Sequence, residues 1–426
     1  MTDGSYWTYS ADTANTLPTL TGDLQADVVV IGGGITGLSA ALHIAELGLS
    51  AVVLDAESPG WGSSGRCGGL VSPRFRISFH EIASTHGADV AQRMYRIGQE
   101  AVDCVEETTE KLCLVSAQFR RCGVVIGAHD ERALARMRVG VSRMREEYGD
   151  PSYMLSADEV GHESGSRDFV GGALMPNTGS VHPLNYVRGL VGGLVKLGIP
   201  VFQNSGVRAI HRDNSSITAE TADGRVKARQ IIFATNAYSN MSAATRSIAS
   251  GIIPFRSSLI ATRLMPNSLC DELLPTRRSV DTSKRILRYY RIVDKRLVFG
   301  GRGAYLMEDD SMAYARLWAD ALKLLPVLAD YPVEFKWSGF VALTLDQFPH
   351  IGQVEDRVFF AGGFNGSGVS MGTLFGKYLA QLVSKQPVDL ALLAAERFRR
   401  GQLPRLHKLG TEIVSRWYQL LDYLGR

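Results

Sequence analysis

Three closely spaced glycines in DVVVIGGGITGLSAALHIAELGLSAVVLDAE, residues 27–57, restrict the fold more than any other feature of this sequence. The Val-rich run at 27–31 predicts a strand buried on both faces. Gly32, Gly34 and Gly37 follow as G-x-G-x-x-G, which permits a tight turn, a close approach of a phosphate to the backbone, and close packing of the next helix. The apolar run at 51–54 predicts a second buried strand. The segment is therefore typical of a βαβ unit that binds a dinucleotide.

The charges of this unit agree with that interpretation. A helix N-terminus carries about half a positive charge and unpaired N–H groups, so a pyrophosphate binds there favourably. Asp55 ends the second strand, about 20 residues past the glycines, where a carboxylate can accept hydrogen bonds from ribose hydroxyls. Glu57 is the alternative for this role. The other interpretation of the motif is a glycine-rich turn in an unrelated βαβ unit.

Composition excludes several other classes of protein. The chain has 426 residues, enough for two or three domains, and its 46 Lys and Arg against 43 Asp and Glu predict no nucleic-acid partner. The N-terminal segment lacks the basic flank and apolar core of a signal peptide, and no apolar run approaches the ~20 residues that span a bilayer. Five scattered cysteines predict no metal site and a reducing, cytoplasmic location.

A second glycine-rich segment, SPGWGSSGRCGGLVSPRF at 58–75, suggests backbone held close to a ligand. The glycine fingerprint followed by S-G-R-x-G-G resembles the D-amino-acid-oxidase-type flavin amine oxidases, and most of all their γ-glutamylputrescine-oxidase branch. The resemblance implies FAD along Ser63, Ser64, Gly65, Arg66, Cys67, Gly68, Gly69 and Leu70. The family commonly has Asn at position 67. Cys67 is either a reactive thiol beside the flavin or, as we favour, a packing thiol.

Three later segments carry the same resemblance. ATNAYS at 234–239 ends a predicted strand, and EFKWSGFVALTLDQFPHIG at 334–352 matches W-x-G…T-x-D-x-x-P-x-I-G. VFFAGGFNGSGVSMGTLFGKYLAQLV at 358–383 reads as a strand, a glycine turn and a helix. By resemblance this helix N-terminus points at the flavin pyrimidine, whose reduced form it would stabilise. Gly368, Gly372 and Gly376 form a bare stripe that predicts close packing of the helix.

The resemblance implies a set of FAD contacts and a non-covalent attachment. Some sarcosine-oxidase relatives bind flavin through a cysteine, and that position is Val341 or Ala342 here. Outside the segment 63–70, the expected contacts are Gly32, Gly34, Ile35, Thr36, Gly37, Asp55, Ala56, Val207 over the adenine, Thr235, Asn236, Trp337, Gly363, Phe364, Asn365, Gly366, Ser367, Gly368 and Val369.

Candidate catalytic residues come from the predicted strands at 286–292 and 297–301, which form a hairpin with its turn at 294–295. In relatives this sheet forms a wall of the substrate cavity. Arg288, Tyr290 and Arg302 are the candidates, together with Tyr289, because an arginine there can pair with a substrate carboxylate. Surface arginines are the alternative. His182, at the start of a predicted helix, is a catalytic candidate or a capping and packing residue.

The fold implied is α/β, with a discontinuous Rossmann-like FAD-binding domain and an antiparallel-sheet substrate domain with helices. Residues 1–80, 150–245 and 336–390 are expected to form the first domain, and residues 81–149 and 246–335 the second. In the N-terminal arm, aromatic residues are expected to anchor by packing. Residues 391–426 are expected to form a helical tail that docks on the body of the protein, contacts another subunit or lies on a membrane surface.

The function implied is oxidation of a C–N bond to an imine, with O2 reduced to H2O2. The arginine-rich sheet favours a small amino acid as substrate, such as the cyclic secondary amino acids proline and pipecolate. A γ-glutamylated polyamine is the alternative substrate. A dehydrogenase that passes electrons to a quinone or another carrier, and a non-catalytic FAD-binding subunit, are alternatives of other classes.

Overall fold

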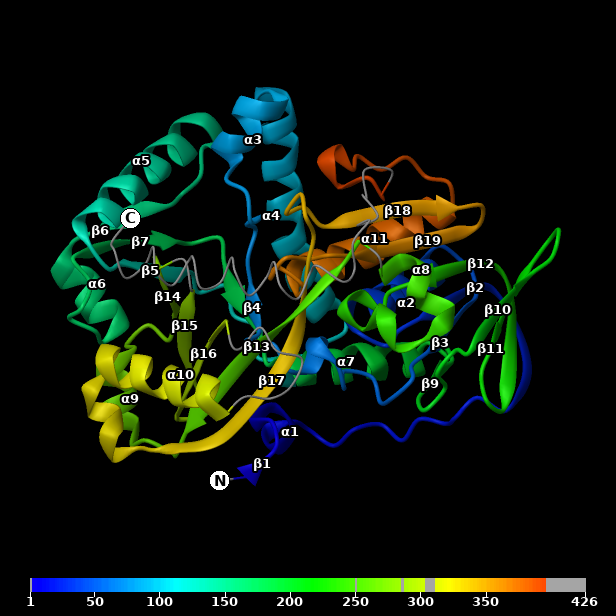
Figure 1. The fold of residues 1–426 in the computed structure, drawn as a ribbon, viewed down its shortest axis with the longest axis horizontal. Helices are drawn as coiled ribbons and strands as arrows, with labels where there is room; N and C mark the ends of the chain where they lie inside the picture. Colours follow the sequence, from blue (N-terminus) through cyan, green and yellow to red (C-terminus); the bar gives the residue numbers. More distant parts are fainter. Residues whose placement is uncertain (1, 250, 285–286, 303–310, 396–426) are drawn as a thin grey trace.

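The computed structural model describes residues 2–249, 251–284, 287–302 and 311–395, in which two large sheets lie beside each other with helices around them (Figure 1). The mixed α/β class expected from the sequence is therefore confirmed. The expected tail beyond residue 395 lies outside the described residues.

The eight-stranded sheet contains the glycine-rich βαβ unit and is therefore named the cofactor sheet. Its strands follow the order β10-β11-β12-β2-β3-β9, and β19 pairs with both β12 and β18. The strands β12, β2, β3, β9 and β19 are parallel, as expected of buried Val- and Ile-rich runs. The strand bounds are β2 Gly22–Ile31, β3 Ala51–Leu54, β9 Val201–Phe202, β10 Ala209–Arg212, β11 Ile217–Glu220, β12 Gly224–Phe233, β18 His350–Glu355 and β19 Val358–Gly362.

Helices α2 (Ile35–Glu46), α7 (Pro183–Lys196) and α11 (Ser370–Val383) share one apolar core with one face of this sheet. The packing of α11 on α2 depends on small residues. A Cβ added at Gly376 would lie 2.4 Å from the Ser39 side chain, and Ser39 Oγ donates a hydrogen bond to Thr373 O at 2.7 Å. The close packing predicted from the glycine stripe is confirmed.

The nine-stranded sheet has the order β1-β17-β13-β16-β15-β14-β5-β7-β6. One face packs on α6 (Ala157–Ser164), α9 (Asn267–Leu273) and α10 (Ser311–Leu324), and the other is turned to the glycine-rich segments of the cofactor sheet. The strand bounds are β1 Thr2–Asp3, β5 Val124–Ala128, β6 Tyr153–Leu155, β7 Gly171–Met175, β13 Ile253–Thr262, β14 Ser279–Thr282, β15 Arg288–Val293, β16 Arg296–Arg302 and β17 Val333–Leu343.

The predicted hairpin of β15 and β16 is confirmed. Asp294 and Lys295 form its two-residue turn with φ of 45° and 65°, as a hairpin turn that follows the strand twist requires. The sheets do not follow the expected domain boundaries at three places. β1, the pair β6 and β7, and residues 336–343 of β17 were expected in the cofactor domain but belong to the nine-stranded sheet. β6 has only three residues and β7 begins with two glycines, so neither shows an alternating pattern from which its sheet could be recognised.

The remaining elements connect or cover these sheets. The N-terminal arm contains the short helix α1, in which Tyr6 and Trp7 are buried as expected, whereas Tyr9 is exposed. The bounds are α1 Tyr6–Ser10, α3 Phe79–His86, α4 Ala88–Lys111, α5 Glu131–Tyr148, α8 Arg246–Ala249, β4 Leu70–Val71 and β8 Gly179–Ser180, with 3-10 turns at Ser63–Gly65, Val115–Ala117, Asn236–Met241, Ala243–Thr245, Pro326–Asp330 and Ala391–Leu393.

Candidate active site

The turn between β2 and α2 has room only for glycine at the predicted positions. Gly32 has φ of 111°, and an added Cβ would lie 2.9 Å from Ala234 O. A Cβ at Gly37 would lie 1.9 Å from Gly32 O, so the helix could not approach the strand. Gly34 is the N-cap of α2 and brings no side chain to its first N–H groups. The turn therefore adds no side chain of its own at the helix start, and phosphate binding there stays a prediction.

Asp55 is turned towards this glycine loop. Its Oδ2 accepts a hydrogen bond from Gly33 N at 2.5 Å, and its Oδ1 accepts one from Glu57 N at 2.8 Å. Burial raises the pKa of Asp55 to about 6, because a charged carboxylate loses hydration there. Two neighbouring backbone N–H groups oppose that shift. The contacts of Asp55 place its carboxyl group at the glycine loop, and its binding of a ribose stays a prediction.

The second glycine-rich segment contacts the first. Ser64 Oγ accepts a hydrogen bond from Ile35 N at 3.1 Å, and a Cβ at Gly34 would lie 2.9 Å from the same Oγ. Ser64 is therefore at the start of α2, next to Thr36 and Gly37. The structure brings these expected FAD contacts together at one edge of the cofactor sheet.

From there the segment 63–69 crosses the cofactor-side face of the nine-stranded sheet. Ser63 Oγ donates a hydrogen bond to Phe340 O, and Trp337 Nε1 donates one to Arg66 O at 2.9 Å. Further along, Gly68 packs against the Tyr289 ring, at 2.5 Å from an added Cβ. The backbone of the segment is thus fixed by strands β17 and β15, and Trp337 acts on it through a carbonyl.

The N-terminal arm also holds this segment, a role that the sequence did not reveal. Trp7 is fully buried, and its Nε1 donates a hydrogen bond to Cys67 O at 2.9 Å. The Arg291 guanidinium lies 5.3 Å from the Trp7 ring centre and donates to Val181 O at 2.6 Å. Burial raises the pKa of the Cys67 thiol, which agrees with the packing role that we favoured.

The loop before α11 closes the site from the other side. Gly363 N donates to Asn236 Oδ1 at 2.9 Å, which joins this loop to the end of β12 beside Thr235. Asn365, with φ of 53°, accepts from Thr344 N at 3.0 Å through Oδ1. Gly363 and Gly366 have φ of 72° and 111°. These bonds give the loop one defined shape around the expected contacts at residues 363–369.

Of the candidate catalytic residues on the hairpin, Tyr290 and Arg288 lie on the face of the sheet that packs on the helices. Tyr290 is buried in the core between the nine-stranded sheet and its helices, and its hydroxyl donates to Ser164 O at 2.8 Å. Arg288 lies on the same side, and its Nε is 2.7 Å from Asp320 Oδ2 of α10. Arg302 ends β16, and its side chain lies outside the described part of the chain. Tyr289, on the opposite face of β15, packs against Gly68.

His182 has the position of a capping residue. Its Nδ1 accepts a hydrogen bond from Asn185 N at 3.1 Å at the start of α7, and its Nε2 lies 3.0 Å from Ser10 Oγ. Burial, with a smaller contribution from Arg291, lowers the pKa of His182 to about 4, so the ring is neutral at pH 7. The Trp7 ring lies edge-on against it at 4.9 Å. The alternative role of capping and packing accounts for all of these contacts.

The residues present fit FAD. The glycine turn, the start of α2 with its N-cap Gly34, the Asp55 carboxylate and the glycine loop before α11 lie around one edge of the cofactor sheet. Val207 is buried beneath this edge, so its contact with the adenine stays a prediction. Within the described residues no cluster of ligating side chains could hold a metal ion. In the same part of the chain, no helix combines the length and apolar character needed to cross a membrane.

Comparisons with known proteins agree with this arrangement. A sequence model of the family "FAD dependent oxidoreductase" matches residues 27–382. "Probable oxidoreductase OrdL" of Haemophilus influenzae is 31% identical over 98% of this chain and 97% of its own length. "Gamma-glutamylputrescine oxidoreductase" of Escherichia coli is 29% identical over 99% and 98%. The crystal structure of glycine oxidase from Geobacillus kaustophilus is similar with a TM-score of 0.76 at 19% identity, covering 88% of this chain and 99% of that one.

Proposed function

Because this chain belongs to the family of FAD-dependent oxidoreductases, we propose that it oxidises the C–N bond of an amine linked to a γ-glutamyl-type group, giving an imine. FAD as cofactor and an amine or amino-acid oxidoreductase activity follow from the family. The finer proposal rests on one observation. The relative that its name describes as acting on γ-glutamylputrescine matches this chain over nearly the full length of both.

The structure weakens the argument for a small amino acid as substrate. That argument depended on arginines of the nine-stranded sheet that would bind a carboxylate. Arg288 instead pairs with Asp320 on the face turned away from the cofactor segments. Arg291 is buried and bonded to the carbonyl of Val181. Proline or pipecolate oxidation is therefore the second candidate, and the γ-glutamylated amine is the first.

The proposed reaction removes two electrons from the substrate. FAD, when bound, would supply the two-electron oxidant: a hydride equivalent would leave the carbon next to the amine, the nitrogen lone pair would form the C=N bond, and an N–H proton would be released to give the imine. The start of α11 supplies a positive electrostatic potential that favours the charge gained on reduction. The segments 63–69 and 363–369 hold the cofactor in place. We propose O2 as the final electron acceptor, which gives H2O2.

The test is an anaerobic screen of flavin reduction on the purified protein. We would offer γ-glutamylputrescine, putrescine, proline, pipecolate, sarcosine and glycine, and then admit air. The proposal expects bleaching of the flavin absorbance by γ-glutamylputrescine, with fast recovery and peroxide in air. Bleaching by a cyclic amino acid alone would contradict it in favour of the second candidate. Slow recovery in air with rapid reduction of an artificial dye would indicate a dehydrogenase.

A further inference from the structure

Asp281 lies on the face of the nine-stranded sheet that is turned to the expected FAD contacts. In the β14–β15 pair it stands directly opposite Tyr289, and opposed residues in a sheet share a face. The Tyr289 ring packs against Gly68 of the cofactor-lining segment. The carboxyl group of Asp281 is therefore directed to the same side as that segment. No role has been assigned to it above.

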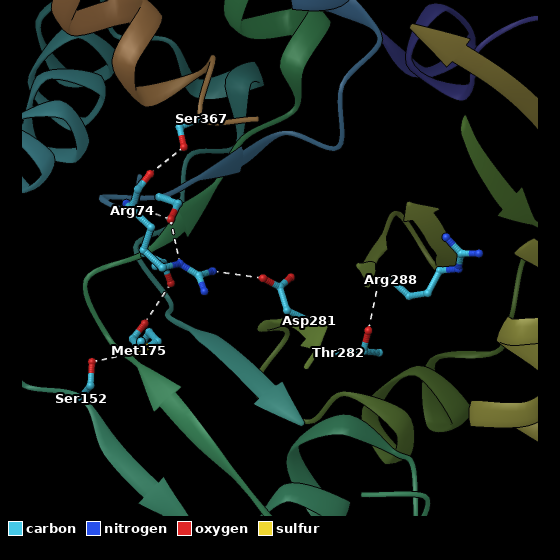
Figure 2. A network of polar contacts seen from close by, with 9 residues as sticks. Arg74, Ser152, Met175, Asp281, Thr282, Arg288 and Ser367 are labelled. Carbon is cyan, nitrogen blue, oxygen red and sulfur yellow. Dashed lines mark hydrogen bonds and ion pairs between the residues drawn. The ribbon is translucent and has the colours of Figure 1, made fainter. Parts of the chain in front are cut away.

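Arg74 joins Asp281 to the loop before α11. Its Nη2 lies 3.0 Å from Asp281 Oδ2, and its own carbonyl accepts a hydrogen bond from Ser367 Oγ at 2.7 Å (Figure 2). Ser367 is one of the expected contacts of the flavin pyrimidine. The Arg74–Asp281 ion pair thus lies between the sheet and the loop that faces the cofactor. In the same view, Arg288 extends away from this pair.

Within the described part of the chain, one oxygen of Asp281 has no hydrogen-bond partner. Oδ2 is bound by Arg74, whereas Oδ1 is buried and accepts no hydrogen bond from the described residues. The whole residue is only 4% exposed, so bulk water does not satisfy this oxygen. Buried polar groups normally have partners, and an unsatisfied charged group is costly to leave. An unsatisfied carboxylate oxygen beside a reaction site indicates a place for a donor that the ligand brings.

The charges of the pair restrict this ligand. An ammonium group is a charged donor that matches Oδ1. Arg74, whose side chain is 36% exposed, retains further guanidinium N–H groups for a carboxylate. A group that carries an ammonium and a carboxylate on one carbon satisfies both sites. It adds no net charge to the buried pair and completes an alternating arrangement of four charges, which avoids the cost of an uncompensated buried ion.

An ammonium held by Asp281 is not the amine that is oxidised. A neighbouring carboxylate favours the protonated form of an amine. Hydride loss from the adjacent carbon needs the free electron pair of a neutral amine. The ligand therefore carries two amines, one in the charged head group and a second one for oxidation.

We propose that Asp281 and Arg74 bind the zwitterionic α-amino-acid head group of the substrate, while its distal amine is oxidised. This inference rests on the proposed function. It makes Asp281 and Arg74 the residues that distinguish substrates with such a head group from amines without one. Asp281 Oδ1 accepts from the head-group ammonium, and Arg74 donates to the head-group carboxylate.

Two measurements on the holoenzyme test the proposal. γ-Glutamylethylamide carries the head group without an oxidisable distal amine, and its binding is followed by calorimetry and by perturbation of the flavin spectrum. The ratio of kcat/KM for γ-glutamylputrescine to that for N-acetylputrescine, which lacks the head group, reports its use during turnover. Asp281→Asn should raise the Kd of γ-glutamylethylamide and lower the kcat/KM ratio, each by about tenfold or more, as for the loss of a hydrogen bond between charged groups.

Matched variants exclude a general loss of structure. Asp281→Glu keeps the charge, so its Kd for γ-glutamylethylamide and its kcat/KM ratio should lie between those of Asp281→Asn and the wild type. Arg74→Gln should lower the same ratio, which keeps the proposal testable if Asp281→Asn does not fold. Glu163→Gln removes the acid of another partly buried pair, with Arg278 beside β14, and should keep the wild-type ratio.

The outcomes separate this inference from the proposed function. If the wild type oxidises both amines with equal kcat/KM and does not bind γ-glutamylethylamide, the head-group site is overturned and the proposed amine oxidation stands. If neither amine reduces the flavin but γ-glutamylethylamide binds and Asp281→Asn abolishes its binding, the proposed function fails and the site stands. Equal effects of Asp281→Asn on both amines would reduce Asp281 to a structural residue and overturn the inference.

Discussion

Replacement of Trp7 by alanine tests whether the N-terminal arm holds the cofactor-lining segment. The Trp7 side chain is fully buried, and its Nε1 bonds to Cys67 O. A buried Trp removes roughly 150–250 Å² from water, worth about 4–6 kcal/mol as an upper value, and Trp→Ala changes in cores cost about 3–5 kcal/mol. The Cys67 carbonyl would also lose its donor. We therefore expect Trp7→Ala to destabilise the protein by about 4 kcal/mol.

Part of this loss of stability should appear as weaker FAD binding, because the hydrogen bond of Trp7 ends on the backbone of residues 63–70, which we expect to line FAD. If about 1.4 kcal/mol of the lost stabilisation also lowers the free energy of FAD binding, the Kd of FAD rises tenfold. The assay has two parts. Urea unfolding is monitored by far-UV circular dichroism, because this signal does not depend on the tryptophan that is removed, and the apoprotein is titrated with FAD. Trp7→Phe keeps a ring but removes the donor, and should cost about 1–2 kcal/mol.

Tyr9→Ala is the matched control on the same helix. Tyr9 is 68% exposed, so its truncation should cost less than about 1 kcal/mol and leave FAD binding unchanged. Two results would refute the reasoning. The first is an equal loss of stability in Trp7→Ala and Tyr9→Ala. The second is a large loss of stability in Trp7→Ala with an unchanged Kd for FAD, which would make the arm a structural element without influence on the cofactor segment.

Three further predictions concern the same site. Gly37→Ala should abolish FAD retention, because its Cβ would lie 1.9 Å from Gly32 O, whereas Gly140→Ala, in open space on α5, should retain FAD and stabilise by about 0.5–1 kcal/mol. The pKa of His182 is lowered to about 4, so stability should fall as pH falls from about 6.5 to 4, and His182→Asn should flatten this dependence in pH-dependent urea unfolding. Acid precipitation should release all yellow colour into the supernatant, and a yellow pellet would disprove non-covalent attachment.

The cofactor side of the site was largely predictable because its glycines are required by the backbone itself. Gly32 and Gly37 stand where a Cβ would meet backbone atoms, and such positions are visible in a sequence as a fixed spacing. Asp55 was identified for a similar reason, since it directly follows a buried strand. These local features predicted the βαβ unit that binds a dinucleotide. FAD and the two-domain fold were implied by the resemblance to the flavin amine oxidases, and the close packing of α11 on α2 was predicted from the glycine stripe of α11.

The substrate side was less predictable because it depends on which face of a sheet meets which segment. Alternation along β15 places Tyr289 and Tyr290 on opposite faces of the sheet, but it does not show which face is turned to the cofactor-binding segments. Helices α6 and α10 cover the face that carries Tyr290, and this leaves the face of Tyr289 for those segments. Asp281 is a single acid in a four-residue strand, with no motif around it. Its significance comes from Arg74, which is 207 positions away in the sequence.

The pairing of β12 with both β2 and β19 has a consequence for biosynthesis. β12 ends at Phe233, whereas β19, the strand that pairs with its residues Ile231–Phe233, is not complete until Gly362. A ribosome that adds roughly 5–20 residues per second needs about 6 to 26 s for that interval. During this time the apolar edge of β12 and the face that receives α11 have no partner within the nascent chain. Translation stopped before β19 would leave the same edge open permanently, so we expect truncated chains to aggregate or to be held by chaperones rather than to accumulate as a folded FAD-binding fragment.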